Sequence, residues 1–290
     1  CNLMLEKIPT VSMSEEKKNH YIGVAKFFRA YTYFRLVQKF GDVPYTDTYL
    51  AQADAEVYAP AKPRAEIMDK VIAELQEAAD LMLVSDDKNV TANKYTAYAA
   101  LSNACLYEGT YRKYHLGQDG SSYLNKAKTA SLMIMNNPSY KLNADWKGLY
   151  NSVELLGNTE VILAKRYLTN VLMHSLQNYT NTSTIQYGLT KWAADSYVTT
   201  NGLPIQQAGN SQYAGDDTAE KTFTNRDPRF GKTVNPANYG YKGKPFGTTA
   251  LVSMSGYVFE LYNNPATTGP DVTTGGRNYT DAPLFTLSEV

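Results

Sequence analysis

Residues 24–44 read VAKFFRAYTYFRLVQKFGDVP, and this stretch restricts the fold more strongly than any other. A surface helix needs only one apolar stripe. Here bulky apolar side chains occupy nearly every side of the expected helix: Phe27, Phe28, Tyr31, Tyr33, Phe34, Leu36, Val37 and Phe40. The pattern predicts a helix that neighbouring elements cover on most of its circumference.

Two arginines, Arg29 and Arg35, lie inside this apolar run. Buried guanidinium groups are tolerated only when they are paired, so we expect Arg29 to meet a buried carboxylate. Gly41 is a suitable C-terminal stop, and Pro44 prevents the helix from continuing. Asp42, between them, is expected to cap or brace the turn.

The helices around this stretch follow from capping and apolar periodicity. The aromatic helix is predicted to begin at Ser12, because Ser12 and Glu15 have the spacing of a capping box. A second helix follows Pro63, a third covers about residues 93–111, and a fourth covers about residues 122–135. The second helix has a stripe at spacings of three and four residues, formed by Ile67, Val71, Leu75, Ala78 and Met82.

These helices indicate a mainly α fold built from antiparallel pairs of the tetratricopeptide type. In the third helix, Ala97, Ala100 and Ala104 form a row of small side chains that would let another helix approach closely. The period is not a strict 34 residues, so we expect a repeat-like packing and not a regular array. Residues 1–150 are predicted to form this helical scaffold.

The chain changes character beyond Trp146, where Gly, Asn, Thr, Pro and Tyr dominate. Residues 160–166 predict a short buried strand and residues 192–198 a short helix. Residues 202–281 are expected to be mainly loops with a few short strands. Residues 151–290 are predicted to pack on the scaffold, so that both parts form one structural unit whose loops provide the function.

Composition favours a protein that meets neutral polar ligands. The formal net charge is zero, which argues against nucleic-acid binding because that function needs a basic footprint. Charged residues make up only 19% of the chain, whereas tyrosine alone occurs 24 times. The sequence has no apolar run of membrane-spanning length and no signal peptide.

The sequence predicts no catalytic residues, no metal site and no cofactor. The three histidines, His20, His115 and His174, are scattered and lack partners at ligand spacing. Asp216 and Asp217 are adjacent, but no calcium-loop pattern surrounds them. A nucleophile elbow and a phosphate loop are also missing.

Several motifs follow the aromatic helix in a fixed order, and together they resemble one family. The Gly41-Asp42-Val43-Pro44 stop comes first, then Pro63-Arg64 with Glu66-Ile67, and then Thr159-Glu160-Val161-Ile162. Asp195, Tyr197, Asn201-Gly202 and Pro204 follow, before the box Asn225-Arg226-Asp227-Pro228-Arg229-Phe230. In this order the motifs resemble the SusD/RagB family of outer-membrane glycan-binding lipoproteins of the Bacteroidota, over almost the whole chain.

The resemblance implies a cell-surface protein that captures oligosaccharide or polysaccharide for nutrient uptake. It implies delivery to a SusC-like TonB-dependent outer-membrane transporter as the partner. Family members are longer, so the chain is interpreted as a fragment that lacks both ends. Cys1 then corresponds to an internal helix position, and we expect a lipid anchor outside this sequence, at the extracellular face of the outer membrane.

Candidate ligand residues are aromatic rings with amides nearby, because a pyranose stacks its C–H face on a ring while its hydroxyls need polar partners. The candidates are Tyr45, Tyr49, Tyr179, Tyr187, Trp192, Asn178 and Gln186. Burial of Trp192 is the competing expectation, since Trp192 starts a helix-like stretch. Arg226, Asp227 and Arg229, like Arg29 and Asp42, are predicted to be structural, stapling loops onto the helices.

Two alternatives remain open beside the glycan-binding hypothesis. One is a peptide-binding or transporter-lid subunit of the same family, and the other is a glycan hydrolase. A solvent-exposed arc of two or three aromatic rings would favour glycan binding, whereas burial of every candidate tyrosine would remove its support. A hydrolase would require two carboxylates that converge in an open cleft.

Overall fold

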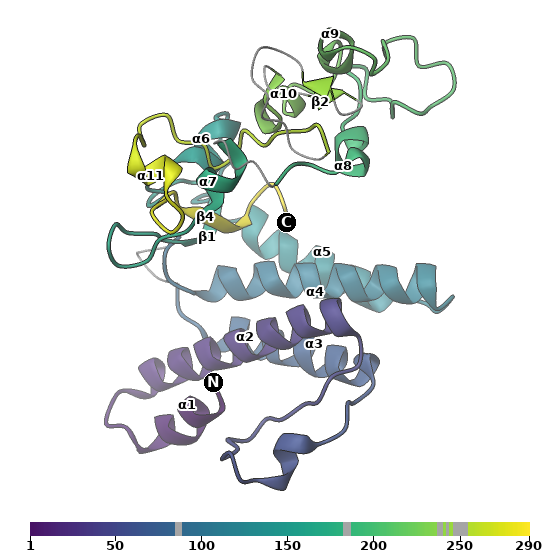
Figure 1. Ribbon diagram of the computed structural model, residues 1–290. Helices are drawn as coiled ribbons and strands as arrows, with labels where there is room; N and C mark the ends of the chain where they lie inside the picture. Colours follow the sequence, from purple (N-terminus) through teal and green to yellow (C-terminus); the bar gives the residue numbers. More distant parts are fainter. Residues whose placement is uncertain (85–88, 182–186, 237–239, 242–243, 246–254) are drawn as a thin grey trace. The chain divides into compact units, whose positions relative to one another are not determined.

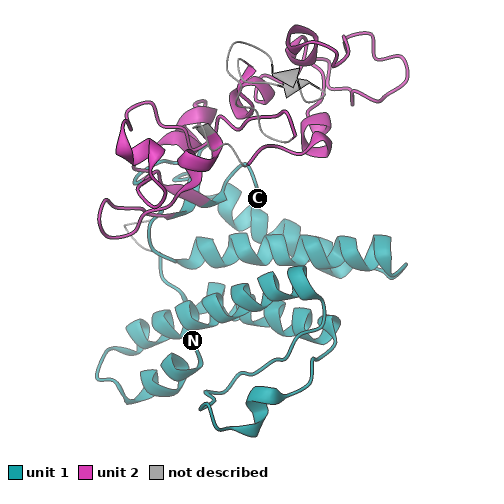
Figure 2. Cartoon of the chain, in the orientation of Figure 1, with its two compact units in different colours: residues 1–142, 156–164, 284–290 teal, residues 143–155, 165–283 magenta. Residues whose placement is uncertain are grey.

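The computed structural model describes residues 1–84, 89–181, 187–236, 240–241, 244–245 and 255–290. Helices dominate the chain, and the predicted mainly α fold class is confirmed (Figure 1). The chain divides into two compact units (Figure 2). Unit 1 contains residues 1–142, 156–164 and 284–290, and unit 2 contains residues 143–155 and 165–283.

This division differs in its boundaries from the predicted break near residue 150. Short segments around residues 160 and 287 belong to unit 1 with the helices, although they lie far from them in sequence. Packing of the loop-rich region on the scaffold as one structural unit stays a prediction.

Unit 1 consists of two antiparallel helix pairs with short helical turns before and between them (Figure 1). The pairs are α2 with α3 and α4 with α5. The elements are α1 (Asn2–Lys7), η1 (Ile8–Thr10), α2 (Glu15–Phe40), η2 (Ala55–Tyr58), α3 (Arg64–Leu81), α4 (Lys94–His115) and α5 (Ser121–Met135).

The aromatic helix α2 is less enclosed than its sequence predicts. Phe27 and Phe34 lie in the core of unit 1, but Phe28 and Phe40 are exposed, and so is Arg35. The expectation of burial around most of the helix was therefore wrong, because the helix packs with one broad face. Its start also differs: Ser14 is the N-cap, and its hydroxyl accepts a hydrogen bond from the Lys17 N–H.

Small residues bring the helices of unit 1 close together. Ala97, Ala100 and Ala104 of α4 are fully buried, as their row predicts. A Cβ atom added to Gly120 would lie only 2.1 Å from the carbonyl oxygen of Gly109, so the start of α5 touches the backbone of α4. The first turn of α4 is fixed by a capping box at Asn93.

Strand β1 (Val161–Lys165) pairs with β4 (Ala282–Thr286) and adds to the helical core of unit 1. β1 coincides with the strand predicted over residues 160–166. Beside it, the Leu287 N–H donates to the Glu160 carbonyl at 2.8 Å. Ile162 and Phe285 are buried in the same hydrophobic cluster as the helices.

Unit 2 consists of short helices joined by loops, with a small hydrophobic cluster of Ala194, Phe230, Val234 and Tyr257. Residues 202–281 contain three short helices in their described part, where loops and strands were predicted. The helices of unit 2 are α6 (Trp146–Asn151), α7 (Leu176–Asn181), α8 (Lys191–Ser196), α9 (Ala219–Phe223), α10 (Phe230–Thr233) and α11 (Pro270–Thr273). β2 (Gly240–Tyr241) pairs antiparallel with β3 (Lys244–Pro245).

Candidate functional site

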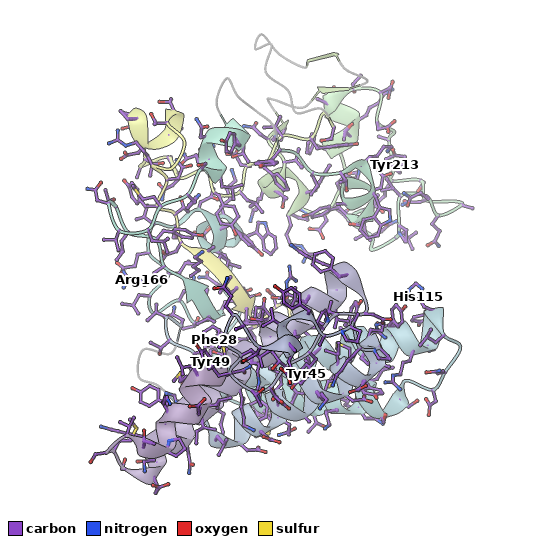
Figure 3. All side chains as sticks on the ribbon, turned by 60° about the horizontal axis from the view of Figure 1, so that its bottom comes forward. Phe28, Tyr45, Tyr49, His115, Arg166 and Tyr213 are labelled. Carbon is purple, nitrogen blue, oxygen red and sulfur yellow. The ribbon has the colours of Figure 1, made fainter. Side chains whose placement is uncertain are left out.

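In unit 1, the two predicted ligand tyrosines lie on the segment after α2 and have different environments (Figure 3). Tyr45 is half-buried against the ring of Tyr33, with ring centroids 4.6 Å apart, and the ammonium of Lys70 lies 4.9 Å from its ring. Burial raises the pKa of Tyr45 to about 12. Tyr49 is 53% exposed and offers its ring to solvent.

Tyr49 lines a cavity of about 540 Å³, whose floor includes Arg29. The Arg29 guanidinium pairs with both carboxylate oxygens of Glu74 and donates to the Asn2 side chain and the Asp47 carbonyl, each at 3.0 Å. The guanidinium thus makes its hydrogen bonds to groups of the protein itself. Arg29 therefore supports the helix pair, and Tyr49 is the exposed aromatic ring of this cavity.

Asp42 is exposed and braces the start of the next helix, as its sequence position predicts. Its carboxylate accepts a hydrogen bond from the Arg64 N–H at 2.8 Å, at the start of α3. A carboxylate at a helix N-terminus satisfies an orphan donor and complements the helix dipole. The contact links the Gly-Asp-Val-Pro stop of α2 directly to the beginning of α3.

In unit 2, the predicted residues are split between the surface and the interior. Tyr187 is 50% exposed and meets Tyr179 edge-on, with ring centroids 5.7 Å apart. Asn178 is only 7% exposed, and its amide donates to the Thr273 carbonyl at 2.6 Å. Asn178 thus lies within the packing of the unit, while Gln186 lies outside the described residues.

Trp192 is 82% exposed, so the competing expectation of its burial was wrong. Trp192 lies in the first turn of α8, whose Thr190 cap accepts from the Ala193 N–H at 3.1 Å. The buried side of this short helix is Ala194, one of the four residues of the hydrophobic cluster. Burial of Ala194 leaves the neighbouring Trp192 ring in solvent.

A cavity of about 390 Å³ opens beside α8 and combines aromatic and polar side chains. Its lining includes Trp146, Leu189, Ser196, Tyr197, Asp227 and Arg229. Ser196 follows Trp192 by four residues, which places both side chains on one face of the helix. Trp192 does not itself line this cavity, but it precedes the lining residue Ala193 on the same helix; we call the cavity the Trp146 cavity.

The rings of the Trp146 cavity are fixed by one hydroxyl. The Trp146 indole N–H donates to Thr233 Oγ1 at 3.3 Å, and the Tyr197 hydroxyl contacts the same oxygen at 3.1 Å. Thr233 in turn donates to the Arg229 carbonyl at 2.8 Å. Aromatic rings held in this way provide a preorganised apolar wall at low cost in side-chain entropy.

Asp227 and Arg229 give the same cavity its polar wall. The Arg229 guanidinium donates to both carboxylate oxygens of Asp227 and lies 6.0 Å from the Trp146 ring. This hydrogen bonding holds the pKa of the Asp227 carboxyl below its usual range. The pair is neutral as a whole but presents charged donors and acceptors, which suits hydroxyl groups of a neutral ligand.

Arg226 lies only three positions before Arg229 but is buried. Its guanidinium donates to the carbonyl oxygens of Ala194 at 2.7 Å and Tyr197 at 2.9 Å, at the end of α8. It also lies 4.7 Å from the ring of Phe230. These contacts staple the arginine-rich segment to α8 and so set the position of the cavity lining.

Trp146 and Tyr197 were not among the predicted ligand residues. In the sequence, Trp146 marks only the end of helical periodicity, and Tyr197 belongs to a family motif. The sequence shows that both residues are aromatic and lie in or near the loop-rich region. It does not show that residues 146, 197 and 229 meet in space. Tertiary contacts within unit 2 bring them together.

Two of the three histidines, His20 and His174, make hydrogen bonds within the protein. The His20 Nδ1 accepts from the Leu83 N–H at 3.1 Å, and His174 contacts the Thr280 carbonyl. Within the described ranges, His, Cys, Asp and Glu side chains form no group of three that could hold a metal ion. No helix among these residues is long and apolar enough to cross a membrane.

Comparison with known proteins identifies the family. A model described as "Starch-binding associating with outer membrane" matches residues 1–106, and the SusD family model matches residues 158–284. The mainly helical fold and these matches define a SusD-type protein. The chain belongs to the SusD/RagB family.

Individual relatives agree with this assignment. SusD-like protein P2 of Formosa agariphila is 27% identical over 174 residues, which are 59% of this chain and 32% of that protein. A SusD-like carbohydrate-binding protein of Bacteroides fragilis has the same fold, with a TM-score of 0.69 and 19% identity over 99% of this chain and 56% of that chain.

A solved structure described as a laminarin-binding SusD-like protein also has this fold, with a TM-score of 0.60 and 19% identity. It is matched over 99% of this chain and 61% of that chain. The chain thus spans little more than half the length of the structures that it matches, and about a third of SusD-like protein P2.

Proposed function

We propose that the chain binds oligosaccharide at the Trp146 cavity. The main supporting observation is that Trp146, Tyr197, Asp227 and Arg229 line one cavity. The exposed ring of Trp192 lies on α8, which contributes Ala193 and Ser196 to the same lining. A pyranose presents an apolar face to a ring and hydroxyls to polar groups, and this cavity provides both. Relatives that are described as binding carbohydrate support the same ligand class.

Tyr49 and Tyr187 are two further candidate sugar contacts, each considered within its own unit. Both rings are about half exposed, in unit 1 and unit 2 respectively. Exposure of these two rings and of Trp192 supports glycan binding over peptide binding, because planar rings suit the apolar faces of sugars. Tyr45 is a weaker candidate, since its ring packs against Tyr33.

The proposed role is capture without catalysis, at the extracellular face of the outer membrane. There the protein would deliver its ligand to a SusC-like TonB-dependent transporter, held by a lipid anchor outside this sequence. The family description of association with the outer membrane supports this location. Co-purification of such a transporter with the tagged full-length protein from detergent-solubilised membranes tests the partnership. Recovery of the protein alone would refute it.

Replacement of the exposed tryptophan tests the ligand site. We expect Trp192→Ala to weaken binding to a glycan selected on an array by about tenfold, which corresponds to about 1.4 kcal/mol of lost stacking. Isothermal titration calorimetry gives the affinity. Tyr58→Ala is the matched control, because Tyr58 is 85% exposed but lies in η2 of unit 1.

The two variants distinguish stacking at the site from a general effect of removing surface rings. Equal affinities of wild-type and Trp192→Ala protein would contradict the Trp146 cavity as the ligand site. Binding to a peptide library, with no binding detected on the glycan array, would favour the peptide-binding alternative. Release of reducing ends from a bound glycan would favour a hydrolase.

A further inference from the structure

Unit 2 contains a second cavity, of about 360 Å³, with a different chemical character. Its walls include Leu176, Phe259, Leu261 and the rings of Tyr187 and Tyr262. Thr180 also lines it, but its hydroxyl donates to the Leu176 carbonyl at 3.0 Å within α7. The cavity therefore offers apolar surface and little that could replace the water around sugar hydroxyls.

The walls of this apolar cavity are held by contacts on both sides. Tyr262 adopts a left-handed backbone conformation with φ of 62°, which is uncommon for a residue with a side chain. Its ring packs edge-on against Tyr150, with centroids 6.1 Å apart, and burial raises its pKa to about 12. The Asn151 amide donates to the carbonyls of Glu260 and Asn263, on either side of the lining residues 261 and 262.

The apolar cavity and the Trp146 cavity share one stretch of chain. Tyr187 and Gly188 line the apolar cavity, and the next residue, Leu189, lines the Trp146 cavity. This stretch is fixed by a bridge between Gly188 and Val258 and by the Leu189 N–H, which donates to the Tyr257 carbonyl at 2.9 Å. In extended backbone, side chains two positions apart lie on the same face, so Tyr187 of the apolar cavity and Leu189 of the Trp146 cavity are about 7 Å apart on one face of this stretch. The two cavities are therefore neighbours along this stretch, and a ligand with two chemically different parts is the kind that this arrangement suits.

The apolar lining of this cavity favours an apolar substituent over a further sugar ring, and its size admits one. An apolar cavity of about 150 Å³ already takes benzene. At about 360 Å³, this one has room for a substituted aromatic ring or a short acyl chain. We infer that the apolar cavity binds an aryl or acyl group carried by the glycan whose sugar rings occupy the Trp146 cavity. This inference rests on the proposed function.

Matched glycoside pairs test the inference with the chain as it stands. The methyl and 4-nitrophenyl glycosides of gluco-, xylo- and galacto-oligosaccharides present the same sugars with and without an aryl group. Calorimetry on wild-type protein is expected to give about tenfold tighter binding of the 4-nitrophenyl member, because its ring leaves water. Equal affinities within every pair that binds would overturn the inference.

Variants of Leu261 test whether an observed preference for the aryl glycoside arises in the apolar cavity. Leu261→Asn makes the wall polar and Leu261→Trp fills the space, so both are expected to bring the ratio within each pair close to one. Binding of the methyl glycosides should stay unchanged in both, which also shows that the variants are folded. Retention of the tenfold ratio in both variants would place the aryl group elsewhere and refute the inference.

Trp192→Ala separates this inference from the proposed function. It should weaken both members of each pair equally and leave their ratio intact, since the aryl group does not touch Trp192. If methyl glycosides bind but show no aryl preference, only the inference fails. If neither member of any pair binds, the proposed function fails and the inference falls with it.

Discussion

At the residue scale, Arg226 and Arg229 show how one short motif divides its side chains between two purposes. Arg226 is buried and bonds to backbone carbonyls at the end of α8. Arg229 pairs with Asp227 in the wall of the Trp146 cavity. Both arginines and Asp227 were predicted to be structural, and Asp227 with Arg229 additionally faces the space proposed for a ligand.

His174 is partly buried, and hydrogen bonds at both ring nitrogens fix its neutral form. Its Nδ1 accepts from the Leu176 N–H at 3.1 Å, so the neutral ring has its proton on Nε2, which contacts the Thr280 carbonyl at 3.0 Å. Burial lowers the pKa of His174 below 6.5, and the contact with Thr280 opposes this effect. Protonation of Nδ1 would place its N–H opposite the Leu176 N–H, so two donors would face each other and this hydrogen bond would be lost.

We therefore predict a stability loss in mild acid that depends on His174. Because the folded-state pKa is depressed, its contribution is complete above pH 6.5 and declines as the pH falls towards the folded-state pKa. Urea unfolding at pH 7.5 and pH 5 measures the loss. His174→Gln, whose amide can still accept and donate, should lose less stability over this interval, and an identical loss in both proteins would contradict the prediction.

At the element scale, charge pairs and small residues together hold the helices of unit 1. Glu108 of α4 is fully buried and accepts from Arg64 of α3 at 2.5 Å and from Arg112 at 2.7 Å. Arg64 also lies 3.8 Å from the ring of Tyr111. Repeat-like helix pairs are thus joined by a buried ionic network in addition to their apolar stripes.

Removing the charge of Glu108 should be costly, because Arg64 would lose its carboxylate partner and Arg112 would keep only Asp69. We expect Glu108→Gln to reduce the free energy of unfolding by about 3 kcal/mol. The matched control is Glu66→Gln, since the Lys62–Glu66 pair is exposed. Its effect should stay within about 0.5 kcal/mol. Chemical denaturation gives the free energy of unfolding of both variants. Similar losses in Glu108→Gln and Glu66→Gln would show that the buried network stabilises the fold no more than an exposed ion pair does.

At the scale of the whole molecule, the chain does not divide into two consecutive domains. Unit 1 takes residues 156–164 and 284–290 as well as its helices. Phe285, near the far end of the sequence, lies in the unit 1 core with its ring centroid 5.5 Å from that of Tyr31 on α2. The helical scaffold is therefore complete only when the late segments have joined it.

This arrangement predicts that a late residue controls the stability of the early helices. Phe285→Ala should lower the free energy of unfolding of unit 1 by about 3–5 kcal/mol, the usual cost of deleting a buried aromatic ring. Leu284→Ala, at an exposed neighbouring site, should cost less than about 1 kcal/mol. Hydrogen exchange of α2 and α4 reports the effect on this unit, and unchanged protection in Phe285→Ala would contradict the prediction.

Local sequence patterns were sufficient to predict the long helices and the family of this protein. Apolar stripes and capping residues predicted the long helices to within a few residues, because helix periodicity and termini are local properties. The order of motifs such as Gly41-Asp42-Val43-Pro44 predicted the family. The same patterns could not show which side of the aromatic helix is buried, and Phe28 and Phe40 proved exposed.

The places where ligand-accessible groups meet depend on tertiary contacts that no local pattern reveals. Trp146, Tyr197 and Arg229 are far apart in sequence, and one cavity gathers them because Thr233 and Arg226 fix the loops around α8. Exposure of Trp192 and burial of Asn178 were decided in the same way. A loop has no periodicity from which burial can be predicted, so its role depends on contacts between distant residues.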